Sequence, residues 1–158
     1  MAVQSTDGTK RTQYPESARG SSVVTGFPAE SLCLEFTEQC YDMEIGKLRE
    51  MVDYFHSIGV KVALDNVTVQ CPAIGVLLEL PIDEIKLDRQ FVKEVPIRKS
   101  NQVLLSMLME ASRSFQFDLC FGGIEDKAAH EYFKQYMGMN YQGFYYAMPM
   151  LSSEFDKL

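Results

Sequence analysis

Residues 60–88 of the chain read VKVALDNVTVQCPAIGVLLELPIDEIKLD, and this stretch decides the fold. Its two ends, residues 60–65 and 84–88, are short apolar runs with the composition of β-strands. Between them, residues 72–80 form a short segment that Pro81 closes, which indicates a helix. Because no hairpin turn separates the two strands and a helix does, the strands are predicted to run parallel.

The same alternation of short apolar runs and longer amphipathic segments continues on both sides of this stretch. Further strands are predicted at residues 32–36, 117–121 and 141–145. Further helices are predicted at residues 45–55, 102–115 and 126–137, where apolar residues recur on one face. Gly59 is expected to stop the first of these helices, and Asp126 and Gly138 to begin and end the last.

Two α/β architectures fit this order of elements: an open doubly wound sheet and a (β/α) barrel. The first strand is not followed by G-x-G-x-x-G, which weakens the dinucleotide-binding form of the open sheet. Polar residues stand late in four strands, namely Glu35, Asp65, Lys86 and Gln142. In a (β/α) barrel the active site is built at that end of the strands.

These four residues have the chemistry of a phosphate site with metal ions. Carboxylate and amide oxygens bind Mg²⁺ or Mn²⁺, and a lysine offsets phosphate charge. Two metal ions at one site stabilise the attacking and leaving oxygens of a phosphodiester. The alternative is that each is a separate polar residue at a strand end, with no common role.

Five motifs in the correct order resemble the EAL-domain family of cyclic-di-GMP-specific phosphodiesterases. They are Glu35-Phe36-Thr37-Glu38 (E-[LI]-T-E), Ala63-Leu64-Asp65-Asn66 (A-L-D-D), Pro81 to Val92 (P-[VI]-D-x-[IL]-K-[IL]-D-x-x-F-[IV]), Gly122-Gly123-Ile124-Glu125 (E-G-V-E) and Tyr141 to Tyr146 (Q-G-[YF]-x-[FY]). The resemblance implies a (β/α) TIM-like barrel that hydrolyses cyclic-di-GMP to pGpG with Mg²⁺ or Mn²⁺. This chain would supply about the last five βα units of it, the C-terminal half.

The resemblance assigns a role to each matching residue near the metal ions. Glu35 corresponds to a metal ligand, and Glu38 to the glutamate that supports the loop beside the metals. Asp65 corresponds to the first aspartate of a metal-binding pair, while Asn66 stands where the second should be. Asn66 keeps one neutral oxygen but removes a negative charge, so metal binding is expected to be weak or absent.

Other positions correspond to the catalytic groups of the family. Lys86 matches the lysine that orients water and phosphate, Glu125 a supporting glutamate, and Gln142 the glutamine near the metals. Gly122 stands where the family has its general-base glutamate. A glycine can neither accept a proton nor bind a metal, and loss of a general base alone typically costs about 10²–10⁴-fold in rate. We therefore expect a degenerate site that is catalytically inactive.

The chain is expected to contain an incomplete EAL-like domain at residues 29–158, after a polar, disordered lead segment at residues 1–28. The lead segment matches none of the motifs, and the family's first three strands are expected to be missing. A (β/α) barrel closes with about eight strands, so five leave open edges that favour self-association or a protein partner. The chain would then act as an interaction module or a residual binder of cyclic-di-GMP. The alternative is an active phosphodiesterase that a separate N-terminal half completes.

Charge and composition narrow the partners further. The net charge of −7 argues against a nucleic-acid partner, which usually requires a basic surface. No apolar run approaches the roughly 20 residues that span a bilayer, so no membrane segment is expected. The four cysteines form no C-x-x-C pair, which favours reduced thiols and a cytoplasmic location.

Overall fold

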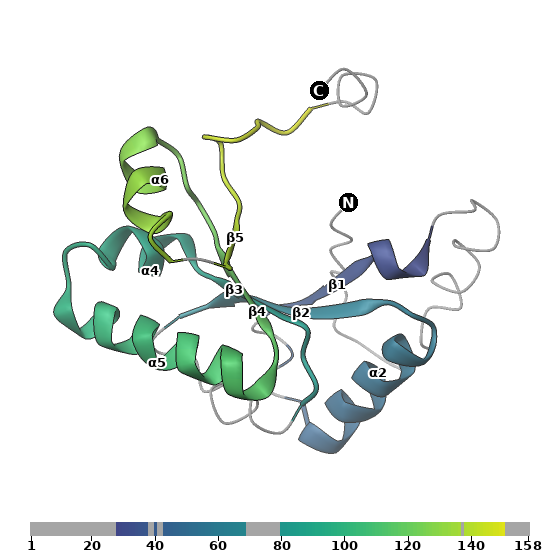
Figure 1. Cartoon of the computed structure of the whole chain (residues 1–158). Coiled ribbons are helices and arrows are strands. Elements are labelled where there is room, and N and C mark those ends of the chain that lie inside the picture. Colours follow the sequence, from purple (N-terminus) through teal and green to yellow (C-terminus); the bar gives the residue numbers. More distant parts are fainter. Residues whose placement is uncertain (1–27, 38–39, 41–42, 69–79, 137, 151–158) are drawn as a thin grey trace.

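Five parallel strands form one sheet in which the spatial order follows the chain order (Figure 1). The computed structural model describes residues 28–37, 40, 43–68, 80–136 and 138–150. The strands are β1 (Cys33–Phe36), β2 (Lys61–Val67), β3 (Glu84–Leu87), β4 (Asp118–Phe121) and β5 (Asn140–Tyr141). A doubly wound sheet reverses its strand order near the middle, and this sheet does not. The order therefore matches an arc of a (β/α) barrel.

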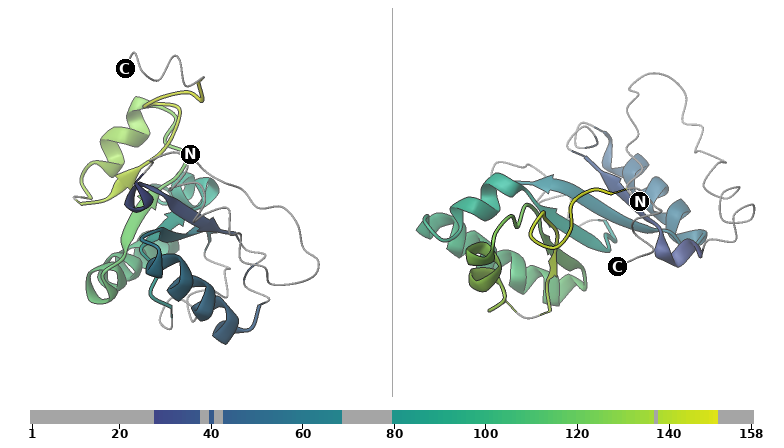
Figure 2. Two further views of the ribbon diagram at one scale, coloured as in Figure 1. Left: turned by 90° about the vertical axis from the view of Figure 1, so that its right-hand side faces the viewer. Right: turned by 90° about the horizontal axis from the view of Figure 1, so that it is seen from above.

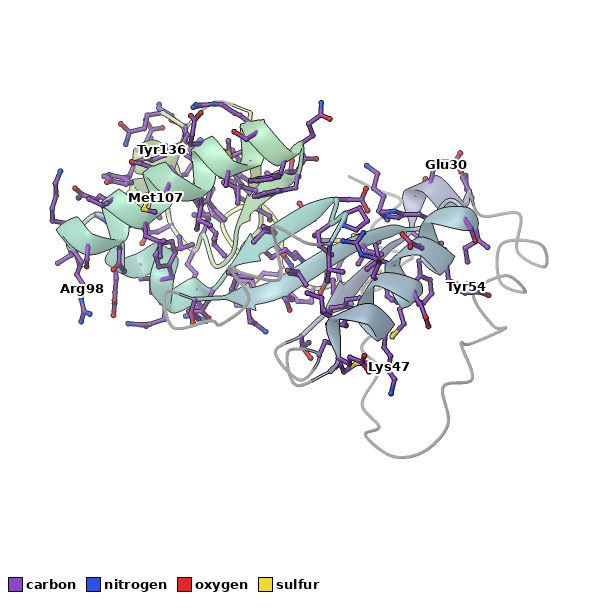
Figure 3. The ribbon with its side chains drawn as sticks, turned by 90° about the horizontal axis from the view of Figure 1, so that it is seen from below. Glu30, Lys47, Tyr54, Arg98, Met107 and Tyr136 are labelled. Atoms are coloured by element: carbon purple, nitrogen blue, oxygen red, sulfur yellow. The ribbon has the colours of Figure 1, made fainter. Side chains whose placement is uncertain are left out.

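The helices fall between successive strands, as a (β/α) fold requires. They are α2 (Ile45–Ser57), α4 (Arg89–Glu94), α5 (Lys99–Phe115) and α6 (Lys127–Phe133), preceded by the short 3₁₀ helix η1 (Ala29–Ser31). Figure 2 shows α2 and α5 on the same side of the sheet. Seen from that side, Lys47 and Tyr54 mark α2, and Met107 marks α5 (Figure 3).

The hydrophobic core lies between the helices and one face of the sheet. Leu48, Val52 and Phe55 are buried at the spacing of one face of α2. They share a cluster with Leu105 and Leu108 of α5 and with alternate residues of the strands, among them Leu64, Ile85 and Leu119. Because successive side chains of a strand point to opposite faces, the other face carries the polar residues on either side of these positions.

Local signals place the ends of the helices. Asp88 begins α4, and its carboxylate accepts the backbone N–H groups of Gln90 and Phe91. Asp126 begins α6 and accepts the N–H of Ala129 at 2.8 Å. The helix α2 ends before Gly59, whose φ is +81°. Glycine adopts this left-handed conformation at little cost, so the predicted stop and the predicted cap at Asp126 are confirmed.

The predicted strands agree with β1 to β4 to within two residues at each end, but the prediction for residues 141–145 is wrong beyond the first residue. The strand β5 stops at Tyr141, and a turn follows in which Tyr146 N–H donates to the Gly143 carbonyl at 3.1 Å. A Cβ built on Gly143 would lie 1.9 Å from the Ile124 carbonyl oxygen. The two backbones are therefore in direct contact, and the aromatic run bends where its composition suggested extension.

Two helix boundaries and one whole helix also differ from the predictions. The helix α5 begins at Lys99, three residues before the predicted start, and α6 ends at Phe133 instead of residue 137. The short helix α4 was not predicted. The predicted helix at residues 72–80 lies outside the described residues except for Leu80, and the lead segment 1–28 does so except for Pro28. In the described part of the chain, no helix is long and apolar enough to cross a membrane.

Candidate functional site

A bulge in β2 brings two of the predicted site residues opposite a third. Residues 64 and 67 of β2 pair with residues 85 and 87 of β3, so Asp65 and Asn66 together lie opposite Lys86. Asn66 has a φ of +56°, a left-handed conformation that asparagine tolerates better than most residues. Its side-chain amide donates to the Asp65 carboxylate at 3.3 Å. The sheet itself therefore gathers these polar groups.

Lys86 and Glu35 form the central ion pair of the site. The Lys86 Nζ lies 2.6 Å from the Glu35 Oε1, and the two side chains are 14% and 20% exposed. Burial lowers the pKa of Lys86, but the hydrogen bond and charge of Glu35, with the charge of Asp65, outweigh it and leave the pKa above its ordinary value. The lysine is thus held as an ammonium ion against a carboxylate.

The same face of the sheet carries further polar groups that the sequence motifs did not identify. Glu84 precedes Lys86 by two residues, and the Asn140 amide donates to its carboxylate at 2.8 Å. Cys33 on β1 and Cys120 on β4 also lie on this face. Counting two residues back from Lys86 along its strand would have identified Glu84 from the sequence.

The two thiols of this face are held in their neutral form. Burial, together with the charge of Glu84, raises the pKa of Cys33 to about 11 and that of Cys120 to about 12. Glu35 also raises both pKa values, while Lys86 lowers them. The carboxylates thus raise the two thiol pKa values by more than the ammonium group of Lys86 lowers them. Neither thiol has the lowered pKa of a reactive cysteine.

Glu125 does not join the Glu35–Lys86 pair. Its carboxylate binds Arg89 and Lys93 of α4, at 2.5 Å and 3.2 Å. These contacts fasten the segment between β4 and α6 to α4. Glu125 and Lys93 also border an open hollow of about 380 Å³ between α4 and α6, whose lining includes Val92 and Phe133.

Gly122 and Gln142 directly follow the ends of β4 and β5. Gly122 N–H donates to the Leu87 carbonyl at 3.3 Å, which extends the β3–β4 pairing past the predicted general-base position. A Cβ on Gly122 would lie only 2.8 Å from that same carbonyl oxygen. Gln142 is exposed and uses its backbone to pair with Phe121 and Ile124. Glu38 lies outside the described residues.

The described residues do not fit a pair of divalent metal ions. Among them, no three histidine, cysteine, aspartate or glutamate side chains form a group suited to hold one ion. Glu35 is bound to an ammonium group, Asn66 turns its amide N–H toward Asp65, and Gly122 has no side chain. Two dications require several converging oxygens with nearly full negative charge. This arrangement instead neutralises its central carboxylate internally.

Comparison with known proteins identifies the family of the chain. The model of the EAL domain matches residues 13–149, and so begins inside the predicted lead segment. The cyclic di-GMP phosphodiesterase PdeR of Escherichia coli is 27% identical over 125 residues, which are 78% of this chain and 19% of PdeR. The chain spans about a fifth of the length of the curated relatives it matches.

Two solved structures show the same fold. The EAL domain of Mycobacterium smegmatis DcpA has a TM-score of 0.80 and 29% identity, over 90% of this chain and 64% of that one. The Bacillus subtilis YkuI protein, solved with substrate c-di-GMP and calcium, has a TM-score of 0.72 and 21% identity, over 90% of this chain and 37% of that one. The predicted family and the partial barrel are therefore confirmed.

Proposed function

The chain belongs to the EAL domain family, and from this premise we propose that it is a degenerate, catalytically inactive relative of the cyclic-di-GMP phosphodiesterases. It would act in cyclic-di-GMP signalling in the cytoplasm, as an interaction module or a residual ligand-binding module. The observation that carries the proposal is Gly122, at the position that the family resemblance gives to the general base. Glu125, three residues further along the chain, does not take its place, because its carboxylate is bound to Arg89 and Lys93.

Metal binding is the second support for the proposal. The resemblance implies Mg²⁺ or Mn²⁺, and YkuI was solved with calcium. In this chain Asn66 replaces a carboxylate, and Glu35 is bound to Lys86. The part of the chain that the structure describes therefore offers no adequate ligand set for two-metal phosphodiester hydrolysis. We therefore propose that Mg²⁺ or Mn²⁺ is bound weakly or not at all.

One observation favours a second candidate function, an active phosphodiesterase completed by a separate N-terminal half. Glu35, Asp65 and Lys86 survive and lie together across three neighbouring strands. Within the described residues, β1 has only β2 as a neighbour in the sheet, so its outer edge could accept further strands. Self-association or a protein partner at this edge is part of the proposal.

Turnover separates the two candidates. The purified chain is incubated with Mg²⁺ or Mn²⁺ and cyclic-di-GMP, and pGpG is measured by chromatography. We expect no product above the level of a boiled sample. Product formation that disappears in Glu35→Ala would refute the inactive assignment. Calorimetry with cyclic-di-GMP then distinguishes a ligand-binding module, which releases heat, from a protein-interaction module, which does not.

A further inference from the structure

We propose that two copies of this chain associate through the hollow between α4 and α6, with Ile97 of each copy inserted into the hollow of the other. The lining residues come from α4, α6 and the segments beside them, so this surface is separate from the open edge of β1. The inference goes beyond the proposed function, because it does not depend on whether the chain is catalytically active.

The hollow has an apolar floor with room above it. Its volume is about 380 Å³, whereas packed protein regions leave few voids larger than a water molecule. The floor includes Val92 and Phe133, which are 2% and 1% exposed, and the Phe133 ring packs on Phe121 at a centroid distance of 4.7 Å. Ala128 and Ala129 of α6 contribute only methyl groups to the wall. The hollow therefore has the size and composition to receive an apolar side chain.

Ile97 is an apolar side chain in the correct place to fill such a hollow. It is 81% exposed, the highest fraction among the large hydrophobic residues in the described part of the chain, and it stands at the rim of the hollow. Its N–H donates to the Glu94 carbonyl at 3.0 Å, which holds the turn between α4 and α5 in place. Figure 3 shows the neighbouring Arg98 at an outer end of the molecule. A second molecule can therefore reach Ile97.

A projecting side chain beside a hollow makes this surface complementary to itself. A two-fold axis near Ile97 sets the α4 side of one copy against the α6 side of the other, so that each Ile97 faces the other hollow. The charged lining residues agree with this arrangement. The one cation among them, Lys93, comes from α4, while the two acids, Glu125 and Asp126, come from the start of α6. Lys93 of one copy would thus approach the exposed Asp126 of the other.

The same features favour a second copy over an unrelated protein as the occupant. An unrelated partner would have to bring an exposed apolar side chain together with an acidic group opposite Lys93 and a basic group opposite Asp126. A second copy carries all three on one surface, at the spacing that the hollow requires.

Sedimentation velocity of the full chain over a series of concentrations tests the inference. We expect the parent to form a dimer that dissociates on dilution. Ile97→Ala should weaken this dimer by about 100-fold or more, because each copy loses one buried isoleucine side chain. Ala128→Trp fills the hollow from its exposed side and should also weaken the dimer. The matched control is Val103→Ala on α5, which is 50% exposed, does not line the hollow and should leave the dimer unchanged.

Two results would overturn the inference. One is a parent chain that stays monomeric at every concentration up to about 1 mM. The other is a dimer whose dissociation constant is the same in Ile97→Ala as in the parent, which would place the contact elsewhere, for example at the edge of β1. Neither result changes the expected absence of pGpG, so the proposed function would stand. Formation of pGpG by the parent would refute the proposed function and leave the dimer contact in place.

Discussion

Restoring the missing general base by Gly122→Glu should fail, because the backbone around this position leaves no room for a side chain. A Cβ at residue 122 would lie 2.8 Å from the Leu87 carbonyl oxygen. The obstacle is main chain of β3, which cannot rotate away as a flexible side chain would. The same carbonyl accepts the Gly122 N–H at 3.3 Å, so a shift that relieves the contact also disturbs this hydrogen bond.

The expected cost follows from this contact. Added atoms in a packed region typically destabilise by about 1–3 kcal/mol. A loss of about 2 kcal/mol lowers the melting temperature of a chain of this size by about 4–8 °C. Gly122→Ala contains the offending Cβ alone and should show most of this loss. Gly122→Glu should show at least as much and should still produce no pGpG.

Gly46 provides a control in the same chain. It lies in the first turn of α2, and a Cβ there would meet its nearest neighbour, a flexible side-chain oxygen of Glu44, at an ordinary 3.9 Å. Replacing a helical glycine by alanine stabilises by up to about 1 kcal/mol. Thermal melts should therefore shift in opposite directions for Gly46→Ala and Gly122→Ala. A Gly122→Ala chain as stable as the parent, or a Gly122→Glu chain that makes pGpG, would refute the steric argument.

Three further predictions concern other parts of the fold. Gln116 ends α5 at a φ of +61°, so Gln116→Gly should stabilise the chain by about 1 kcal/mol in urea unfolding, and a loss of stability would contradict this. The Asp83 carboxylate accepts the Val62 N–H at 2.7 Å and contacts the His56 ring at 2.8 Å, so Asp83→Ala should destabilise by about 2–3 kcal/mol and Asp83→Asn by less. Burial raises the pKa of the Cys120 thiol from 9.0 to about 12, so the folded state retains the thiol proton where the unfolded state loses it. The contribution of this thiol to the free energy of unfolding is full below pH 9 and falls as the pH rises toward 12. In urea unfolding, the free energy of unfolding should therefore decline less between pH 8 and pH 10 in Cys120→Ala than in the parent chain.

The sequence predicts the sheet well because each strand combines a strong apolar pattern with a clear boundary. In β3, buried residues alternate with polar ones, and β2 contains the buried apolar run Val62–Leu64. Pro81 separates the intervening segment from the strand that follows. The end of β5 could not be predicted in this way. Residues 142–145 have strand-like composition, but the close contact between Gly143 and Ile124 is made between residues far apart in sequence. The apolar and polar pattern of a single segment does not encode such contacts between distant parts of the backbone.

Part of the cluster was predictable from the sequence, and its contacts were not. Spacing along the strands placed Glu35, Asp65 and Lys86 at one end of the sheet, and the structure brings these three together. Their roles stay a prediction. The bulge at Asn66 was not predictable, because it depends on the register between two strands. The attachment of Glu125 to α4 escaped prediction because the helix itself did.

These contacts also bear on whether a second chain could complete the site. A partner that pairs with β1 adds strands beside Glu35, at one edge of the sheet. Gly122 follows β4, which is three interstrand steps of about 4.8 Å away within the sheet. A closed barrel could bring a partner's side chain across to that side, but the partner would leave the Leu87 carbonyl and the Glu35–Lys86 ion pair where they are. Completing the barrel therefore supplies strands without making room for a base at residue 122. An active assembly would require the partner to provide its own base, which is a stricter demand than closing the sheet.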